Sequence, residues 1–160
     1  MLFRSDQAAR EIEHRQAGIE RILSVGTDLE SSRRAVGLAE AHSDVWAVAG
    51  WHPGHAEEAP DDFRAELRAL ASHPKVVAIG ECGLDFFRLP TRVGTGTVSD
   101  DERIRAKQAV VFAQQLEVAA ELGLNVVIHT RDSFAETMAQ FRPYADRVRA
   151  VFHCFVGTPA

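Results

Sequence analysis

The sequence predicts an α/β fold built on a parallel sheet, and three features of its 160 residues lead to this class. Short apolar runs rich in Val, Ile and Ala alternate with longer segments that have helical periodicity. The apolar runs lack polar–apolar alternation, which is typical of strands covered on both faces of a parallel sheet. The segments between them are long enough for helical crossovers between parallel strands. An open doubly wound sheet and a barrel both fit this order.

The first half of the chain predicts three helices and two strands. Asp28 is expected to cap the second helix, because a side-chain oxygen before the first turn accepts a free backbone N–H. Phe63, Leu67 and Leu70 recur at helical spacing and give the third helix one apolar stripe. In chain order, these elements are a helix at 5–16, a strand at 19–25, a helix at 29–42, a strand at 45–49 and a helix at 61–72.

The second half predicts three strands and two helices. Gly123 is expected to end the first of these helices. Ser133 with Glu136 forms a capping-box pattern at the start of the second. The buried stripe of that helix is expected to be Phe134, Met138 and Phe141. In chain order, the elements are a strand at 76–80, a helix at 101–122, a strand at 125–128, a helix from Ser133 and a strand at 149–152.

The segment 89–100 fits neither kind of element. Pro90, Gly94, Gly96 and four Thr or Ser residues make it too polar for a strand and too glycine-rich for a helix. Such an insert is either a mobile active-site loop or a surface insertion without a role, and the sequence leaves both open.

Composition excludes several classes of protein. The net charge of −5 argues against a broad basic surface that grips nucleic acid, so any contact with phosphates must be local or metal-mediated. No apolar run approaches the roughly 20 residues that span a bilayer, and no signal peptide is expected. Cys82 and Cys154 are expected to be free structural thiols, which indicates a reducing compartment and hence the cytoplasm.

Polar residues follow one predicted strand after another. Glu81 comes directly after the strand at 76–80, His129 after the strand at 125–128, and His153 after the last strand. The carboxyl ends of parallel strands lie at one edge of the sheet, where α/β proteins bind ligands. Two imidazoles and a carboxylate meeting there form a candidate site for a divalent metal.

Each of these residues can also be interpreted as an ordinary structural or surface residue with no role in a site. His129 and His153 could be polar loop residues, and Glu81 could lie solvated at the rim. Asp85 orients a ligand histidine or caps a loop. His52 and His55 flank a Pro-Gly turn, where they are turn-surface residues or substrate contacts. Arg88 and Arg131 clamp a phosphate or are simply solvated.

Five segments together resemble the TatD-type deoxyribonucleases over nearly the whole chain. They are ERILSVGTDLESS (20–32), AGWHPGHA (49–56), AIGECGLDFFR (78–88), VVIHTRDSF (126–134) and VFHCFVGTP (151–159). The third is similar to the family's G-E-x-G-L-D signature, and the last two to its I-H-x-R and H-C-F-x-G segments. Each segment is short, but five in the family's order and spacing are specific.

The resemblance implies a (β/α)₈ barrel of the metal-dependent hydrolase type, with divalent Mg, Mn or Zn ions as cofactors. It implies Glu81, His129 and His153 as metal ligands, and Glu81 and Arg131 as catalytic residues. Substrate contacts are expected from His52, His55, Asp85 and Arg131. The implied reaction is hydrolysis of a phosphodiester in DNA by metal-activated water, often from a 3′ end. No membrane and no obligate protein partner are implied.

The chain departs from the family pattern at both ends. The family's H-x-H pair after its first strand and its E-T-D segment after its last strand have no counterpart here. A complete barrel has about 250 residues. We therefore expect 1–160 to form a single incomplete barrel domain of about five parallel strands with helices outside, lacking the first strand and the last two. Gly54 also separates His52 and Pro53 from His55, where the family often has a His directly.

Two alternatives to a nuclease stay open. One is another hydrolase of the same superfamily that acts on an amide or an ester, including an aminoacyl ester. The other is a non-catalytic remnant or binding scaffold.

We expect the 160-residue chain alone to be weakly active or inactive, because it supplies about three ligands where a two-metal site needs about six. A nuclease assay of the purified chain with Mn²⁺ or Mg²⁺ checks this expectation. Turnover comparable to that of a complete family member would contradict it.

Overall fold

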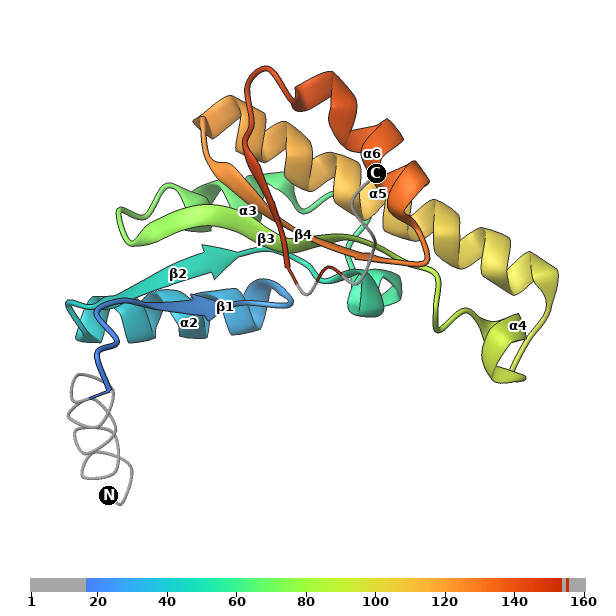
Figure 1. Cartoon of the computed structure of the whole chain (residues 1–160), viewed down its shortest axis with the longest axis horizontal. Helices are drawn as coiled ribbons and strands as arrows, with labels where there is room; N and C mark the ends of the chain where they lie inside the picture. The colour runs from blue at the N-terminus through green and yellow to red at the C-terminus, as the bar shows by residue number, and fades with distance from the viewer. Residues whose placement is uncertain (1–16, 154, 156–160) are drawn as a thin grey trace.

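The computed structural model describes residues 17–153 and 155 (Figure 1), so the helix predicted at 5–16 and Cys154 lie outside the described residues. The described strands are β1 Ile22–Val25, β2 Val45–Ala49, β3 Val76–Asp85, β4 Asn125–Arg131 and β5 Ala150–Phe152. The α-helices are α2 Leu29–Ala41, α3 Arg64–Ala71, α4 Pro90–Val93, α5 Val98–Leu122 and α6 Phe134–Phe141. Two 3₁₀ helices, η1 Pro53–Glu58 and η2 Arg142–Tyr144, complete the order.

The five strands form one parallel sheet in the order β1-β2-β3-β4-β5. A doubly wound sheet reverses its strand order at a switch point, whereas strands that follow one another around a barrel keep the order of the chain. The sequential order of the strands therefore favours a barrel and excludes a doubly wound sheet for these five strands. Within the described residues the sheet is open, with β1 and β5 at its edges. The predicted partial barrel of about five parallel strands is confirmed.

The main core lies between the sheet and a layer of helices, of which α5 packs along β3 and α6 along β4 (Figure 1). The strand β4 shows that the two faces of the sheet have different environments. Val126, Ile128 and Thr130 are buried under the helices, whereas His129 and Arg131 on the other face are only partly buried. We call this second face the open face of the sheet. The largest buried side chains of the core include Phe63, Phe112, Leu67, Ile79 and Leu116.

A β-bulge in β3 places its acidic side chains on the open face. Ile79 pairs with Val126 and Cys82 with Ile128, so β3 has one more residue than β4 in this interval. A bulge shifts the alternation of side chains by one position. The shift puts Glu81 on the side of His129 rather than among the helices. Beyond the bulge the alternation resumes, and Asp85 pairs with Arg131.

Two glycines allow β3 and β4 to come this close. Gly80 has φ +146° and Gly83 has φ +126°, a region that glycine adopts far more readily than other residues. A Cβ on Gly83 would lie 2.1 Å from the carbonyl oxygen of His129, and one on Gly80 would lie 2.6 Å from that of Val127. The G-E-C-G spacing of the sequence thus corresponds to a close backbone approach.

Several predicted bounds are wrong. The strands β3 and β4 run beyond 80 and 128, so Glu81, Asp85, His129 and Arg131 lie inside strands. The segment 89–100 is partly helical, because Thr97 and Asp100 form a capping box that starts α5 at Val98. The strand predicted from 19 begins at Ile22, and the helix predicted at 61–72 is α3, Arg64–Ala71.

The predicted helix ends at Asp28, Gly123 and Ser133 are confirmed, but the capping bond expected of Ser133 is absent. Asp28 caps α2 through Ser31, and Gly123 ends α5 in the left-handed conformation. Ser133 makes no capping bond, because its Oγ donates instead to the carbonyl of Leu84 at 2.7 Å, between α6 and β3. The predicted stripe of α6 also fails at Phe134, which is 49% exposed and packs on Phe152 and Phe155.

We predict that Gly83→Ala lowers the free energy of unfolding by roughly 3 kcal/mol or more, because the new Cβ meets backbone and the positive φ is strained. Gly37→Ala is the matched control. Gly37 lies exposed in α2 with nothing within 4 Å of a built Cβ, so this change should stabilise by about 0.5–1 kcal/mol. Urea denaturation measures both, and a Gly83→Ala variant as stable as the parent would contradict the bulge argument.

Candidate metal centre

Three strands bring two carboxylates and two imidazoles together on the open face. The Glu81 Oε1 atom lies 3.2 Å from the Nδ1 of His129 and 3.2 Å from the Nδ1 of His153. On the other side of the His129 ring, the Nε2 atom lies 3.1 Å from the Oδ2 of Asp85. The residues Glu81, His129 and His153, which the sequence placed at successive strand ends, therefore meet in space.

His52 joins this group from the loop after β2. Its ring lies 4.6 Å from that of His129, centroid to centroid. Its Nδ1 accepts a hydrogen bond from the backbone N–H of Gly54 at 3.0 Å, which leaves Nε2 for another contact. Ligand atoms of His52, Glu81 and His129 lie within 4.8 Å of one another, which makes this the group that could hold a metal ion among the described residues.

Three other predicted site residues, His153, His55 and Asp85, lie outside this group of three. His153 contacts Glu81 but has a side chain that is 57% exposed, and it is not one of the three grouped residues. His55 lies in η1 with its Nδ1 3.8 Å from the Oε1 of Glu58. The contacts of Asp85 are compatible with both interpretations, because its Oδ2 lies 3.1 Å from the Nε2 of His129 and its Oδ1 accepts from the N–H of Phe87 at 3.0 Å.

The charges of the centre are strongly coupled. Burial lowers the pKa of His129, but the hydrogen bonds with Asp85 and Glu81 outweigh burial and raise it to about 9. The hydrogen bond with His129 lowers the pKa of Glu81 to about 2 against the effect of burial. Burial, with the nearby His129, lowers the pKa of His52. Without a metal, His129 is therefore an imidazolium between two carboxylates, while His52 is neutral.

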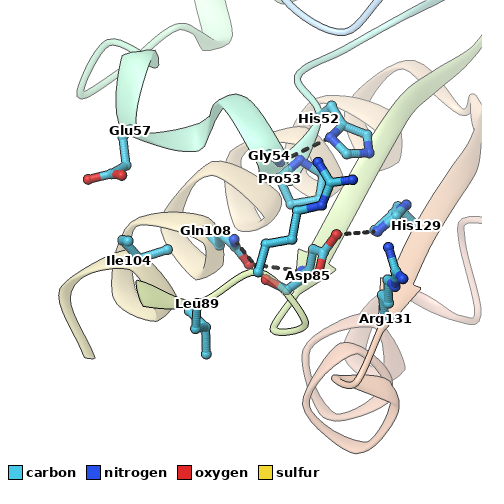
Figure 2. Close-up of a pocket in the computed structure, with 11 residues that line it drawn as sticks. His52, Pro53, Gly54, Glu57, Asp85, Leu89, Ile104, Gln108, His129 and Arg131 are labelled. Atoms are coloured by element: carbon cyan, nitrogen blue, oxygen red, sulfur yellow. Dashed lines mark hydrogen bonds and ion pairs between the residues drawn. The ribbon is translucent and has the colours of Figure 1, made fainter. Parts of the chain in front are cut away.

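Two buried glutamines of α5 hold the end of β3 and the loop after β2, and no sequence motif singled them out. The amide of Gln108 accepts from the N–H of Asp85 at 2.9 Å and donates to its carbonyl at 3.1 Å (Figure 2). Gln115 does the same for Trp51, the residue before His52, at 2.7 and 2.9 Å. Both glutamines are less than 5% exposed. Their spacing of seven residues, two turns of one helix face, was the signal that could have revealed them.

A cavity of about 310 Å³ opens beside the centre. His52 and His129 form the end of it that belongs to the metal group, and Arg131 projects from the end of β4 (Figure 2). The guanidinium carbon of Arg131 lies 3.6 Å from the centroid of the Phe87 ring, a cation–π contact. The full lining is His52, Pro53, Gly54, Glu57, Asp85, Arg88, Leu89, Ile104, Gln108, His129 and Arg131.

The donor set fits a divalent metal. Imidazole nitrogens with a carboxylate oxygen are ligands that Zn²⁺ and other first-row divalent ions accept. Asp85 behind His129 supplies the carboxylate that commonly fixes a ligand histidine. The fold and this centre define the class: a partial (β/α) barrel with a candidate metal site at the carboxyl ends of its strands.

Comparisons with known proteins identify the family. The model of the family described as "TatD related DNase" matches residues 2–160. The 3′-5′ ssDNA/RNA exonuclease TatD of Cronobacter turicensis is 43% identical over 145 residues, and that of Musicola paradisiaca is 41% identical over 158. The solved TatD homologue YjjV of Escherichia coli has a TM-score of 0.79 and 28% identity. The chain belongs to the TatD-related DNase family.

The alignments cover this chain and its relatives unequally. They include 90% and 98% of this chain but 51% and 55% of the two exonucleases. For the YjjV structure, the shares are 98% and 57%. The chain thus spans about half the length of the curated relatives it matches. A TatD family hydrolase of Entamoeba histolytica, with a TM-score of 0.71 and 24% identity, shares the fold.

We predict that the metal-free chain loses stability as the pH rises from 7 to 10. The pKa of His129 is about 9 in the fold, against about 6.5 in the unfolded chain. Its favourable charge is present below pH 6.5 and is lost as the pH passes through 9, which costs at most about 3 kcal/mol. Urea denaturation in EDTA across this range measures the loss. His129→Gln should remove most of the pH dependence, and an unchanged slope would contradict the assignment.

Proposed function

We propose that this protein is a metal-dependent phosphodiesterase that acts on DNA or another nucleic acid. The observation that carries the proposal is the convergence of Glu81, His129 and His52 on one point beside a cavity that contains Arg131. Family membership supports the reaction type. The 3′-5′ cleavage of single-stranded DNA and RNA, which the names of the relatives state, is the activity proposed for the whole protein.

The ligands proposed for the metal are Glu81, His129 and His52, with His153 as a further ligand. A bound divalent ion would supply the activated water and stabilise charge on the phosphate oxygens. Mg²⁺, Mn²⁺ and Zn²⁺ are all candidates, and the imidazole donors favour Mn²⁺ and Zn²⁺ over Mg²⁺. For His129 to ligate, it must give up a proton, so metal affinity should rise with pH.

The other residues of the centre have roles that follow from their contacts. Asp85 orients the His129 ring through Nε2, and Gln108 fixes the backbone of Asp85. Arg131 presents a fork of N–H donors that suits a phosphate. Its contact with Phe87 holds the guanidinium near the mouth of the cavity. The chain's own contribution is thus a set of positioned donors and acceptors around a scissile phosphate.

We also propose a cytoplasmic location. Cys82 supports it, because free thiols are typical of a reducing compartment. Among the described helices, none combines the length and the apolar character that crossing a membrane requires.

The test compares metal binding by the parent chain with binding by Glu81→Gln. We expect at least a tenfold loss of Mn²⁺ affinity by calorimetry, because the change removes the charged oxygen ligand. Glu66→Gln on the exposed surface of α3 is the matched control and should bind as the parent does. With enzyme in excess over a labelled single-stranded oligonucleotide, Arg131→Ala should slow cleavage on the order of 100-fold.

Equal Mn²⁺ affinity of the parent and Glu81→Gln would refute the metal centre. A metal centre that persists while Arg131→Ala cleaves DNA at the parent rate would refute the phosphate contact. That second result would favour a hydrolase for another kind of ester or amide.

A further inference from the structure

We propose that Gln115 is a positioning residue of the metal centre, which sets where the His52 imidazole lies relative to Glu81. The side chain of Gln115 is fully buried, and its hydrogen bonds go to backbone atoms rather than to a member of the metal group. It acts through the segments that precede His52 and Glu81. The inference rests on the proposed function, in which these two residues are ligands, and it adds what holds them together.

The segment between β2 and His52 is fixed through its backbone. Each of three consecutive N–H groups donates to a partner on another segment. These bonds run from Gly50 to the Oγ of Ser32, from Trp51 to the Oε1 of Gln115 and from His52 to the carbonyl of Thr27, at 3.1, 2.7 and 3.0 Å. The Nε2 of Gln115 also donates to the carbonyl of Trp51 at 2.9 Å. One side chain thus satisfies both polar backbone groups of the residue before His52, and such buried groups are costly to leave unpaired.

Gln115 also lies beside the segment that leads to Glu81. A Cβ built on Gly50 would lie 2.6 Å from the Oε1 of Gln115 and 2.6 Å from the carbonyl oxygen of Gly80. Gly80 directly precedes Glu81 in β3. The amide of Gln115 therefore lies where the end of β2 and the middle of β3 come closest, between the segments that carry two members of the metal group.

The histidine of this loop needs more support than the other members of the group. Glu81 and His129 lie in β3 and β4, which pair with each other in the sheet. His52 lies outside the strands, between β2 and η1. Yet its ring lies 4.6 Å from that of His129, and ligand atoms of the three residues lie within 4.8 Å of one another. The bonds of Gln115 to Trp51 supply the fixed attachment that the loop needs to keep this geometry.

The adjacent glutamine of α5 shows the same bonding without a link to the metal group. Gln114 is 6% exposed, accepts from the N–H of Phe63 at 3.0 Å and donates to the carbonyl of Asp61 at 2.6 Å. These bonds hold the segment before α3, which contains no residue of the metal group. Gln114 is therefore a matched control for Gln115, because the two differ in the segment they hold and not in the kind of bond.

The experiment compares Gln115→Met with Gln114→Met in the 160-residue chain. Methionine is close to glutamine in length but has no N–H donor and only a weak acceptor, so each variant loses both backbone bonds. Both variants should lower the urea midpoint by similar amounts, because each leaves a buried N–H and a buried carbonyl unpaired. Only Gln115→Met should also weaken Mn²⁺ binding, on the order of tenfold by calorimetry, which is typical when the support of a ligand is removed.

A second readout needs no metal. In the parent and in Gln114→Met, ring protons of His52 and His129 should give a nuclear Overhauser effect, because the ring centroids lie 4.6 Å apart. Gln115→Met should lose most of this signal. If Gln115→Met does not fold, the parent chain provides the test. Zn²⁺ should then shift the side-chain amide resonances of Gln115, which is bonded to the loop of a ligand, and leave those of Gln114 in place.

Equal Mn²⁺ affinity of the two folded variants, an unchanged ring-to-ring signal in Gln115→Met, or Gln115 amide resonances that ignore bound Zn²⁺ would each overturn the positioning role. These results are separate from the test of the proposed function. A parent chain that binds neither Mn²⁺ nor Zn²⁺ would refute the metal centre, while the ring-to-ring signal of the metal-free variants would still judge Gln115.

Discussion

At Gly80 and Gly83 the backbone of β3 lies so close to β4 that a Cβ at either position would meet a carbonyl oxygen. This approach and the bulge between Ile79 and Cys82 set which way the acidic residues point. A regular strand would direct Glu81 into the helix layer, where an unpaired carboxylate is costly to bury. The bulge turns Glu81 to the open face instead, beside His129. The contacts of Glu81 with His129 and His153 depend on this feature.

The same placement creates an electrostatic requirement for a cation. Glu81 and Asp85 lie on either side of His129, and both carboxylates are less than 15% exposed. In the metal-free chain the required positive charge is the proton on His129, which explains why the pKa of that histidine rises to about 9. A divalent metal bound here would therefore compete with this proton for one region of negative charge. The stability of the fold and the metal affinity proposed for it would then be two consequences of a single charge arrangement.

The sequence predicted the parallel sheet and the residues at its carboxyl edge, because both follow from simple rules. Buried apolar runs indicate strands, and parallel strands end at one edge, so Glu81, His129 and His153 were expected to meet. The glycines at 80 and 83 were visible in the motif, but the bulge depends on the register between two strands that are far apart in the chain. Single-strand periodicity carries no such information, which is why β3 was predicted to end too early.

Side chains that bond to distant backbone were equally beyond local rules. Ser133 has the pattern of a helix cap, yet the carbonyl of Leu84, a residue of another element, takes its hydroxyl. Gln108 and Gln115 looked like ordinary helix residues until β3 and the loop after β2 were placed against them. Capping and periodicity describe a segment with its neighbours in sequence. They miss contacts that only the folded sheet creates.

The helix α5 connects the parts of the site that differ most in chemistry. Gln115 holds the backbone of Trp51 beside His52, and Gln108 holds Asp85 behind His129. Ile104, one turn before Gln108, lines the cavity. Because these residues occupy one face of a single rigid helix, the metal histidines and the cavity wall share a common frame. The spacing between the backbone at Trp51, the backbone at Asp85 and Ile104 therefore follows the helical rise.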